Sequence, residues 1–465
     1  MHSKLLNKNL GFYDSSFFRM HISTNEKIER IDTLSDEAYA ILVHEYIHFI
    51  QDITTIHGLN NIFSTIQYIK FAVNEIYKGS NEFIVPIEPT DMNVDDFVYF
   101  NNRICEISYG DSESYSDVEI IDYKKITLPV DKQCAVKEMP VIEMDIRIDD
   151  SYDDKYVFGA CCIYESMAYI LEKNLSQFGF VEAPDLPYNS AIKMAEKIYK
   201  EFAEDEMNVL AVCDISLNCS NPGKVFVEII EEWKNNNIIP NDPKELYDDF
   251  YKKKFQSTKA SKDGVIHVQV DYLTFFQENL KLVGQELNSY FRPTNNNVND
   301  EFSRKMSLIR RWISEIFTTV LKWRKENKYF IIDIAEGGEK YNNKYFASFF
   351  NEIGMPFCTN NNNDGCFYHP KFPDNELQLS YFSAVSQIKN IFNGSLEVCD
   401  LYCYCRKCEM DGTGDVKTDK RCLTPWERSS DKKLCPVSTI WRHWKLDGYK
   451  PILKIIKKPA PNKRS

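Results

Sequence analysis

Two histidines and a glutamate stand close together in the segment 41–54, which reads ILVHEYIHFIQDIT. His44 and His48 are four residues apart, so on an α-helix their imidazoles lie on one face, one turn above each other. Two imidazoles placed in this way can share one metal ion, and Glu45 lies on the flank of the same face. This H-E-x-x-H spacing is typical of sites in which a metal activates water and the carboxylate acts as general base. The alternative is a pair of buried histidines in an ordinary helix.

The surrounding sequence predicts the helix that places these side chains. Ser35 is a suitable N-cap, and Asp36 and Glu37 favour the first helical turn. Gly58 is expected to end the element. Apolar residues occur on more than one side of this helix, which indicates that it is buried nearly all round. Histidines in such a helix need polar partners or a metal ion.

A zinc site with two histidines needs a third protein ligand. His57 lies nine residues after His48, on the opposite side of the helix, and does not fit. The best candidate is Glu165, because a carboxylate in the apolar helical segment 159–174 is costly unless it is paired or bound to metal. Glu172, two turns along the same face, is the competing candidate. The alternative is that Glu165 is a partly exposed helix residue without a role as ligand.

The two segments HEYIHFIQD and ESMAYILE resemble the gluzincins, a group of zincin metallopeptidases with two histidines on one helix and a glutamate on another. The resemblance covers residues 35–60 and 155–175 and the sheet that supports them. It implies a zincin-like fold and a zinc-dependent metallopeptidase activity. One position departs from the pattern, because gluzincins commonly have an aspartate four residues after the ligand glutamate, where this chain has Tyr169.

The resemblance also implies roles for single residues. His44, His48 and Glu165 would bind the catalytic zinc ion, and Glu45 would be the general base. Asp52 matches an acidic position that often follows the motif, and it is expected to orient an imidazole.

Such a peptidase needs a hydrogen-bond donor for the oxyanion that forms when the peptide carbonyl is attacked. Tyr164 and Tyr169 are the tyrosines nearest the predicted site in the sequence. Substrate backbones often pair with an edge strand, and the segment 16–23, SFFRMHIS, is a candidate strand.

Six of the fourteen cysteines crowd between residues 399 and 435. A long chain without an export signal favours reduced thiols and metal binding over disulfides. Cys405 and Cys408 have the spacing of a zinc knuckle, and Cys422 and Cys435 complete a set of four thiolates for a structural zinc ion. The alternatives are free thiols in a small helical subdomain, or ligation by Cys399, Cys403 or His443.

The charge is uneven along the chain. The net charge is −13, yet residues 417–465 hold 14 Lys or Arg and 4 Asp or Glu, a balance of +10 that leaves −23 for the rest. Cations interspersed with Trp426, Trp441 and Trp444 can bind nucleic acid or a protein partner. The alternative is that this basic region packs on the acidic body.

Hydropathy and composition complete the prediction. The sequence has no window of about 18 apolar residues and no apolar signal segment, so we expect no membrane span and a cytoplasmic protein.

The predicted fold is α+β and mainly α-helical. A zincin-like catalytic core at 1–185 contains an acidic β insert at about 82–150, and a helical domain at 186–395 and a cysteine-rich, basic module at 396–465 follow. The predicted function is hydrolysis of a peptide or protein substrate, and the alternative is a non-enzymatic protein that binds nucleic acid or protein.

Overall fold

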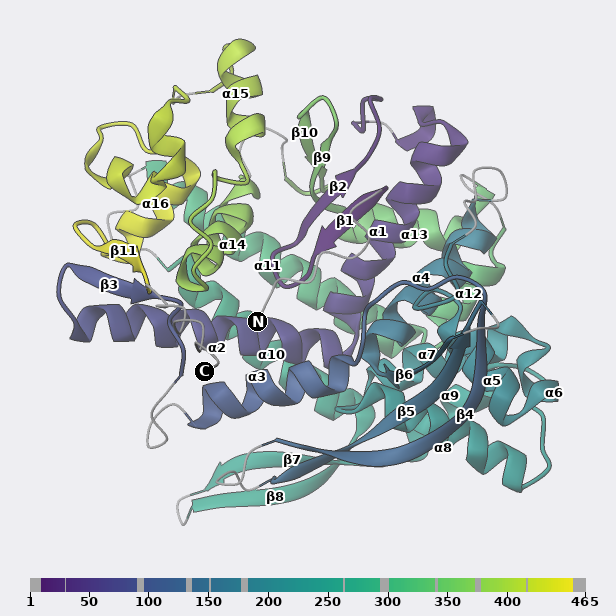
Figure 1. Cartoon of the computed structure of the whole chain (residues 1–465). Helices are drawn as coiled ribbons and strands as arrows, with labels where there is room; N and C mark the ends of the chain where they lie inside the picture. Colours follow the sequence, from purple (N-terminus) through teal and green to yellow (C-terminus); the bar gives the residue numbers. More distant parts are fainter. Residues whose placement is uncertain are drawn as a thin grey trace, which may run out of the picture. The chain divides into compact units, whose positions relative to one another are not determined.

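The structure is a computed structural model, and it is mixed α/β and mainly helical, which confirms the predicted fold class at this level (Figure 1). It describes residues 10–29, 31–89, 96–130, 136–149, 152–176, 183–261, 264–292, 301–338, 342–372, 378–414 and 417–454. The chain packs into two compact units, a larger one (Lys4–Ile66 and Tyr99–Leu379) and a smaller one (Gln67–Val98 and Ser380–Ser465). The predicted domain boundaries at residues 185 and 395 do not coincide with this division.

The larger unit contains most of the helices and three of the sheets. A four-stranded mixed sheet has the order β1-β2-β9-β10, strands β4, β5 and β6 form an antiparallel sheet, and β7 and β8 form a hairpin. Its strands are β1 (Gly11–Asp14), β2 (Arg19–Ile22), β4 (Val118–Pro129), β5 (Glu138–Ile148), β6 (Tyr152–Phe158), β7 (Lys254–Ser261), β8 (Gly264–Asp271), β9 (Met355–Asn360) and β10 (Gly365–Tyr368). Its complete helices are α1 (Asp36–Thr54), α4 (Ala160–Leu175), α5 (Ser190–Ile198), α6 (Lys200–Ala203), α7 (Glu206–Leu217), α8 (Pro222–Asn235), α9 (Lys244–Lys252), α10 (Tyr272–Tyr290), α11 (Glu301–Glu326), α12 (Phe330–Glu336) and α13 (Lys344–Ile353), with η1 (Ile31–Thr33).

The smaller unit is built from short elements. Strands β3 (Glu82–Val85) and β11 (Lys450–Leu453) pair in parallel. The helices are α14 (Ser380–Phe392), α15 (Tyr402–Met410), η3 (Lys420–Leu423), η4 (Pro425–Ser430) and α16 (Pro436–His443). Two helices, α2 (Ile56–Lys78) and α3 (Asp96–Tyr109), run from one unit into the other.

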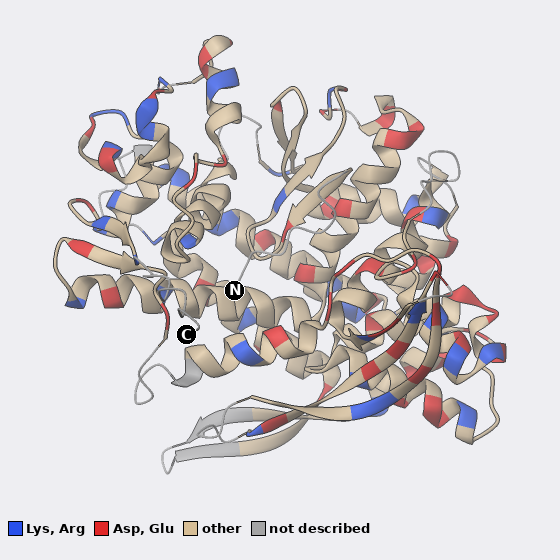
Figure 2. Cartoon of the chain, in the orientation of Figure 1, with Lys and Arg blue, Asp and Glu red and all other residues tan. Residues whose placement is uncertain are grey.

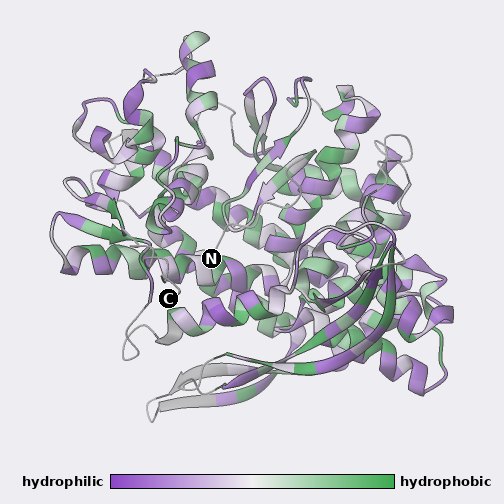
Figure 3. Ribbon diagram, viewed as in Figure 1, coloured by the Kyte–Doolittle hydropathy of each residue, from purple (hydrophilic) through white to green (hydrophobic). Residues whose placement is uncertain are grey.

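The region 82–150 is more varied than a β insert. It contains helix α3 beside strands β4 and β5, and strand β3 belongs to the smaller unit. Figure 3 shows hydrophobic and hydrophilic stretches alternating along β4 and β5, and the side chains of β4 accordingly alternate between buried and more exposed positions. This alternation is what a sheet covered on one face requires.

Helix α1 begins as the sequence predicts. The Ser35 hydroxyl accepts a hydrogen bond from the backbone N–H of Ala38 at 3.3 Å, and every residue from Ala38 to Thr54 is buried. The expected end at Gly58 is wrong, because α1 ends at Thr54 and Gly58 lies in α2. A Cβ atom at Gly58 would come within 2.5 Å of the Cα of Asp52, so glycine lets the start of α2 pass against the end of α1.

A buried ion pair holds the end of α1. Arg324 of α11 pairs with Asp214 of α7 at 2.7 Å, and both side chains are almost completely buried. The same guanidinium donates hydrogen bonds to the carbonyl oxygen of Thr54, at 2.9 and 3.1 Å. These bonds satisfy a carbonyl that a helix end would leave without a partner. They also tie α1 to the surrounding helices of the larger unit.

Candidate metal centre

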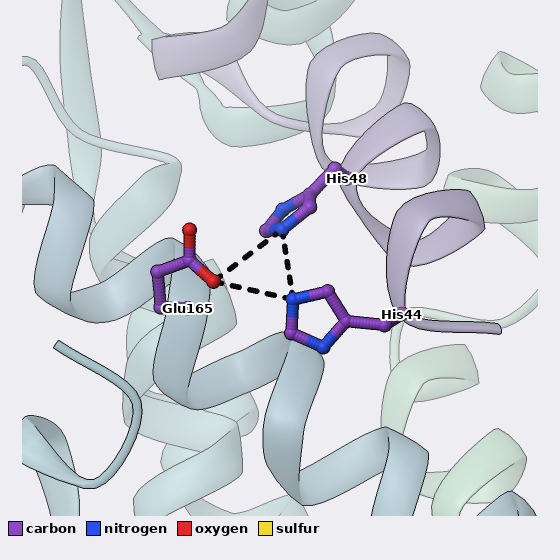
Figure 4. A group of neighbouring side chains, drawn as sticks. All are labelled: His44, His48 and Glu165. Carbon is purple, nitrogen blue, oxygen red and sulfur yellow. Dashed lines mark hydrogen bonds and ion pairs between the residues drawn. The ribbon is translucent and has the colours of Figure 1, made fainter. Parts of the chain in front are cut away.

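The side chains of His44, His48 and Glu165 meet where α1 packs against α4 (Figure 4). The two Nε2 atoms of the histidines lie 3.2 Å apart. Oε2 of Glu165 lies 3.2 Å from Nε2 of His44 and 3.6 Å from Nε2 of His48. All three residues are buried. Within the described residues, they form the one group of three or more His, Cys, Asp or Glu whose ligand atoms all lie within 4.8 Å of one another.

The Nδ1 atom of each imidazole, on the side of the ring away from the other two ligand atoms, has its own hydrogen-bond partner. Nδ1 of His48 lies 2.8 Å from Oε1 of Gln51, and the amide group of Gln51 donates to the carbonyl oxygen of Tyr164 at 2.9 Å. Because that donation fixes Oε1 as the acceptor, Nδ1 of His48 carries the proton. Nδ1 of His44 lies 3.0 Å from Oε2 of Glu172, so it too is a donor. In the neutral imidazoles, both Nε2 atoms therefore present a lone pair.

With both imidazoles neutral, three lone-pair atoms face one another inside the protein. That arrangement is repulsive unless positive charge lies among them, either a second proton on His44 or a bound cation. Two ligands bound to zinc at about 2.0–2.1 Å with tetrahedral angles lie about 3.3 Å apart, and the three measured separations are close to this value. The donor set of two imidazoles and one carboxylate is also that of a catalytic zinc site. The residues present therefore fit a zinc ion.

The electrostatics of the chain alone agree with a site for positive charge. Burial acts to lower the pKa of His44, but hydrogen bonds to Glu165 and Glu172 hold it well above its ordinary value. For Glu165, burial acts to raise the pKa, but His48 and His44 bring it down to about 2. The raised pKa of His44 and the lowered pKa of Glu165 both mean that the surroundings favour a positive charge beside an ionised carboxylate.

Glu45 lies on α1 between the two histidines and is 2% exposed. Its Oε2 atom has no hydrogen-bond partner, and a Cβ atom at Gly11 of β1 would come within 2.8 Å of its Oε1 atom. Burial raises the pKa of Glu45 well above its ordinary value, while His44 lowers it and Glu165 and Glu172 raise it further. A buried carboxylate oxygen without a hydrogen-bond donor is suited to accept a proton.

Asp52, which was expected to orient an imidazole, binds elsewhere. Its carboxylate accepts hydrogen bonds from the hydroxyls of Tyr13 and Ser15 and from the backbone N–H of Ser16, at 2.8 to 3.0 Å. It therefore fastens the loop after β1 to α1. The contacts to the imidazoles come from Glu172 and Gln51, so Glu172, the competing candidate for third ligand, contacts His44 on the side away from Glu165.

Tyr188, which the sequence did not single out, lies beside the metal-binding atoms. Its ring centroid lies 5.8 Å from that of His44, and its hydroxyl has electrostatic interactions with Glu165 and Glu45. Burial and these charges raise the pKa of Tyr188, so the hydroxyl stays protonated and can donate a hydrogen bond. The hydroxyl of Tyr164 instead lies 3.0 Å from Nδ1 of His57, and that of Tyr169 accepts from the backbone N–H of Ala183 at 3.5 Å.

The predicted edge strand is also placed differently. The segment 16–23 contains β2, which pairs with β1 on one side and β9 on the other. It is therefore an inner strand. Among the described strands, β1 lies at the edge of this sheet, and the Gly11 contact shows that β1 passes next to Glu45.

The six C-terminal cysteines are all free and lie in the smaller unit. Cys405 and Cys408 are in α15, Cys422 is in η3, and Cys435 is the N-cap of α16. Their sulfur atoms are more widely spaced than the ligand atoms of the His44 group, since no three of them meet the same 4.8 Å criterion among the described residues. Cys399 is buried, Cys403 is exposed, and His443 is in the last turn of α16.

Figure 2 shows Lys and Arg along the C-terminal elements, but several of these arginines bind inside the smaller unit. Arg421 pairs with Asp419 and Asp431, each at 2.9 Å, and Arg442 donates to the carbonyl oxygen of Ser429 at 2.6 Å. Part of the basic charge that suggested a nucleic-acid contact therefore stabilises the fold of this unit.

No family model, curated protein or solved structure matches this chain. In the described part of the chain, no helix combines the length and the apolar character that crossing a membrane requires.

Proposed function

We propose that the protein is a zinc-dependent metallopeptidase whose catalytic centre is formed by His44, His48, Glu165 and Glu45. The observation that carries the proposal is the meeting of three ligand atoms, at 3.2 to 3.6 Å, beside a buried carboxylate with an unpartnered oxygen. A protonated His44 would explain its own contact with Glu165, but it leaves the buried, unpartnered oxygen of Glu45 without a role, whereas metal-assisted hydrolysis uses that oxygen as the base.

In this proposal each residue of the site has its own role. His44, His48 and Glu165 would hold the zinc ion, and Glu172 and Gln51 keep both imidazoles in the tautomer that exposes Nε2. When bound, zinc supplies a Lewis acid that polarises a carbonyl group and acidifies water. Glu45 accepts a proton from the attacking water and passes it to the leaving amine.

Two further features favour a peptide as substrate. The ring of Tyr188 lies 5.8 Å from that of His44, and its protonated hydroxyl would donate a hydrogen bond to a developing oxyanion. Strand β1, at the edge of its sheet and next to Glu45, offers backbone groups with which an extended peptide can pair. Together they match the resemblance of the two helices to the gluzincins.

The test is Glu45→Gln in the full-length protein, incubated with a proteome-derived peptide mixture and read by mass spectrometry for new N termini. We expect cleavage by the zinc-loaded wild type and its loss in Glu45→Gln, with zinc content unchanged. Glu37→Gln makes the same change at an exposed position of α1 and should cleave like the wild type. Cleavage by Glu45→Gln at the wild-type rate would reject Glu45 as the base. Cleavage by neither protein, with zinc bound, would favour a binding function.

A further inference from the structure

The cysteine-bearing elements of the smaller unit lack the core contacts that hold its other elements. Neither α15 nor η3 has a buried residue. By contrast, α16 buries Val437, Ile440 and Trp441, and the Trp441 ring lies 6.3 Å from that of Phe83. A small module that cannot bury its elements needs disulfides or a metal to fix them. All six cysteines here are free, so a metal is the device that fits.

Four of these thiols share one neighbourhood. The thiol of Cys405 has electrostatic interactions with those of Cys408, Cys422 and Cys435. The segment before α15 is joined to η3 by the N–H of Cys399, which donates to the carbonyl oxygen of Cys422 at 3.1 Å. The Ser438 hydroxyl of α16 donates to the carbonyl oxygen of Pro425, two residues after η3, at 2.7 Å. The tight turn after α15 adds two hydrogen bonds to the carbonyl oxygen of Cys408, from Thr413 and Gly414.

Two groups of the fold can donate hydrogen bonds to these sulfur atoms. Cys435 is the N-cap of α16, and its Sγ accepts a hydrogen bond from the backbone N–H of Ser438 at 3.5 Å. Arg428 is 2% exposed and interacts electrostatically with Cys422 and Cys435. Its Nε atom has no hydrogen-bond partner. The guanidinium also pairs with Asp419 at 2.8 Å, so its free Nε–H is the group that can donate to a zinc-bound thiolate.

We propose that Cys405, Cys408, Cys422 and Cys435 bind a second, structural zinc ion that fastens α15 and η3 to the N-terminus of α16. Zinc draws the sulfur atoms closer than they lie in the chain alone, because each coordinates at about 2.3 Å. Four thiolates close the coordination shell, so this zinc ion has a structural role and does not depend on the proposed peptidase activity. His443 is eight residues after Cys435, about 12 Å along the helix axis, and is too distant to share the ion.

The two zinc sites can be separated by their ligands. The full-length His44→Ala/His48→Ala variant should still carry about one zinc ion per chain. Reconstitution of this variant with Co²⁺ should give the near-ultraviolet absorption of thiolate-to-cobalt charge transfer, which imidazole and carboxylate ligands do not produce. Absence of both zinc and this absorption would overturn the proposal, whatever the outcome at Glu45.

Substitutions identify the ligands in the same background. Cys405→Ser, Cys408→Ser, Cys422→Ser and Cys435→Ser should each lose the zinc ion or most of the charge-transfer absorption. Cys403→Ser is the matched control, since Cys403 is an exposed cysteine of the same helix α15, and it should keep both. Retention of zinc by all four variants would overturn the proposal. Loss in Cys399→Ser combined with retention in Cys422→Ser would overturn this ligand set. The cobalt spectrum of the His44→Ala/His48→Ala variant, which keeps all its cysteines, tests whether thiolates bind the metal even if a cysteine variant fails to fold.

Discussion

Nδ1 of His44 on α1 and Oε2 of Glu172 on α4 lie 3.0 Å apart, although the two residues are 128 positions apart in the sequence. This contact fixes the proton of His44 on Nδ1 and turns its Nε2 toward His48 and Glu165. A carboxylate in this position also makes the imidazole a stronger ligand. The contact leads to the first prediction.

Glu172→Ala should weaken zinc binding by about 10–100-fold, because His44 loses the group that orients it. Glu165→Ala should weaken it far more, since it removes a ligand. A competition titration with a chromophoric chelator measures both. Glu201→Gln, at an exposed position of α6, is the control and should bind zinc like the wild type. Equal losses in Glu172→Ala and Glu165→Ala would mean that Glu172 is itself a ligand.

The sequence predicts the parts of this site that depend on local spacing. The helix around His44 and its Ser35 cap follow from periodicity and capping rules, which act over a few residues. The partner of His44 does not follow from spacing, because Glu172 is selected by how α1 packs on α4. Gln51 lies one turn after His48 on α1, and only the direction of its amide depends on α4, through the carbonyl oxygen of Tyr164. Tyr188 has no sequence signal at all, since it lies after α4 and reaches the site only through the fold. Asp52 was assigned by analogy with a family, whereas the loop at Ser15 and Ser16 decides its partner.

Gly11→Ala should lower peptide turnover by about 100-fold, as a displacement of about 1 Å at a catalytic group can do. The new Cβ atom would lie 2.8 Å from Oε1 of Glu45 and 2.8 Å from the backbone carbonyl oxygen of His21. The backbone of β2 cannot give way easily, so the carboxylate must move. Steady-state kinetics and zinc analysis check this, with zinc content expected to stay unchanged. Gly79→Ala is the control, because its nearest neighbour would be 3.6 Å away. Wild-type turnover in Gly11→Ala would show that Glu45 tolerates the shift.

Tyr188→Phe should lower kcat by about 100–1,000-fold and leave KM nearly unchanged, because the hydroxyl would act only on the oxyanion of the transition state. Zinc content should stay at the wild-type level. Tyr169→Phe removes the hydroxyl of a neighbouring tyrosine, 6.3 Å from Tyr188 between ring centroids, and should keep wild-type kinetics. A rise in KM with constant kcat would instead assign Tyr188 to ground-state binding.

His57 gives the larger unit a defined sensitivity to acid. Burial lowers the pKa of His57 to about 4, from an ordinary value of 6.5, and Nδ1 and Nε2 lie 3.0 Å and 3.4 Å from the hydroxyls of Tyr164 and Ser108. Above pH 6.5 the imidazole is neutral in both the folded and the unfolded chain. Between pH 6.5 and 4 only the unfolded chain takes up the proton, so the free energy of unfolding falls as the pH falls.

Between pH 7 and pH 4 the free energy of unfolding of the wild type should therefore fall by about 3 kcal/mol because of His57, since each pKa unit corresponds to about 1.36 kcal/mol. His57→Gln should lack this part of the fall. Urea denaturation of wild type and variant at several pH values measures this difference. Other groups that titrate in the same range, such as Asp52 with its pKa raised to about 6 by burial, are present in both proteins and cancel in the comparison. His267→Gln, at an exposed histidine, should leave the pH dependence as in the wild type. Parallel pH profiles for wild type and His57→Gln would mean that His57 is protonated in the folded chain.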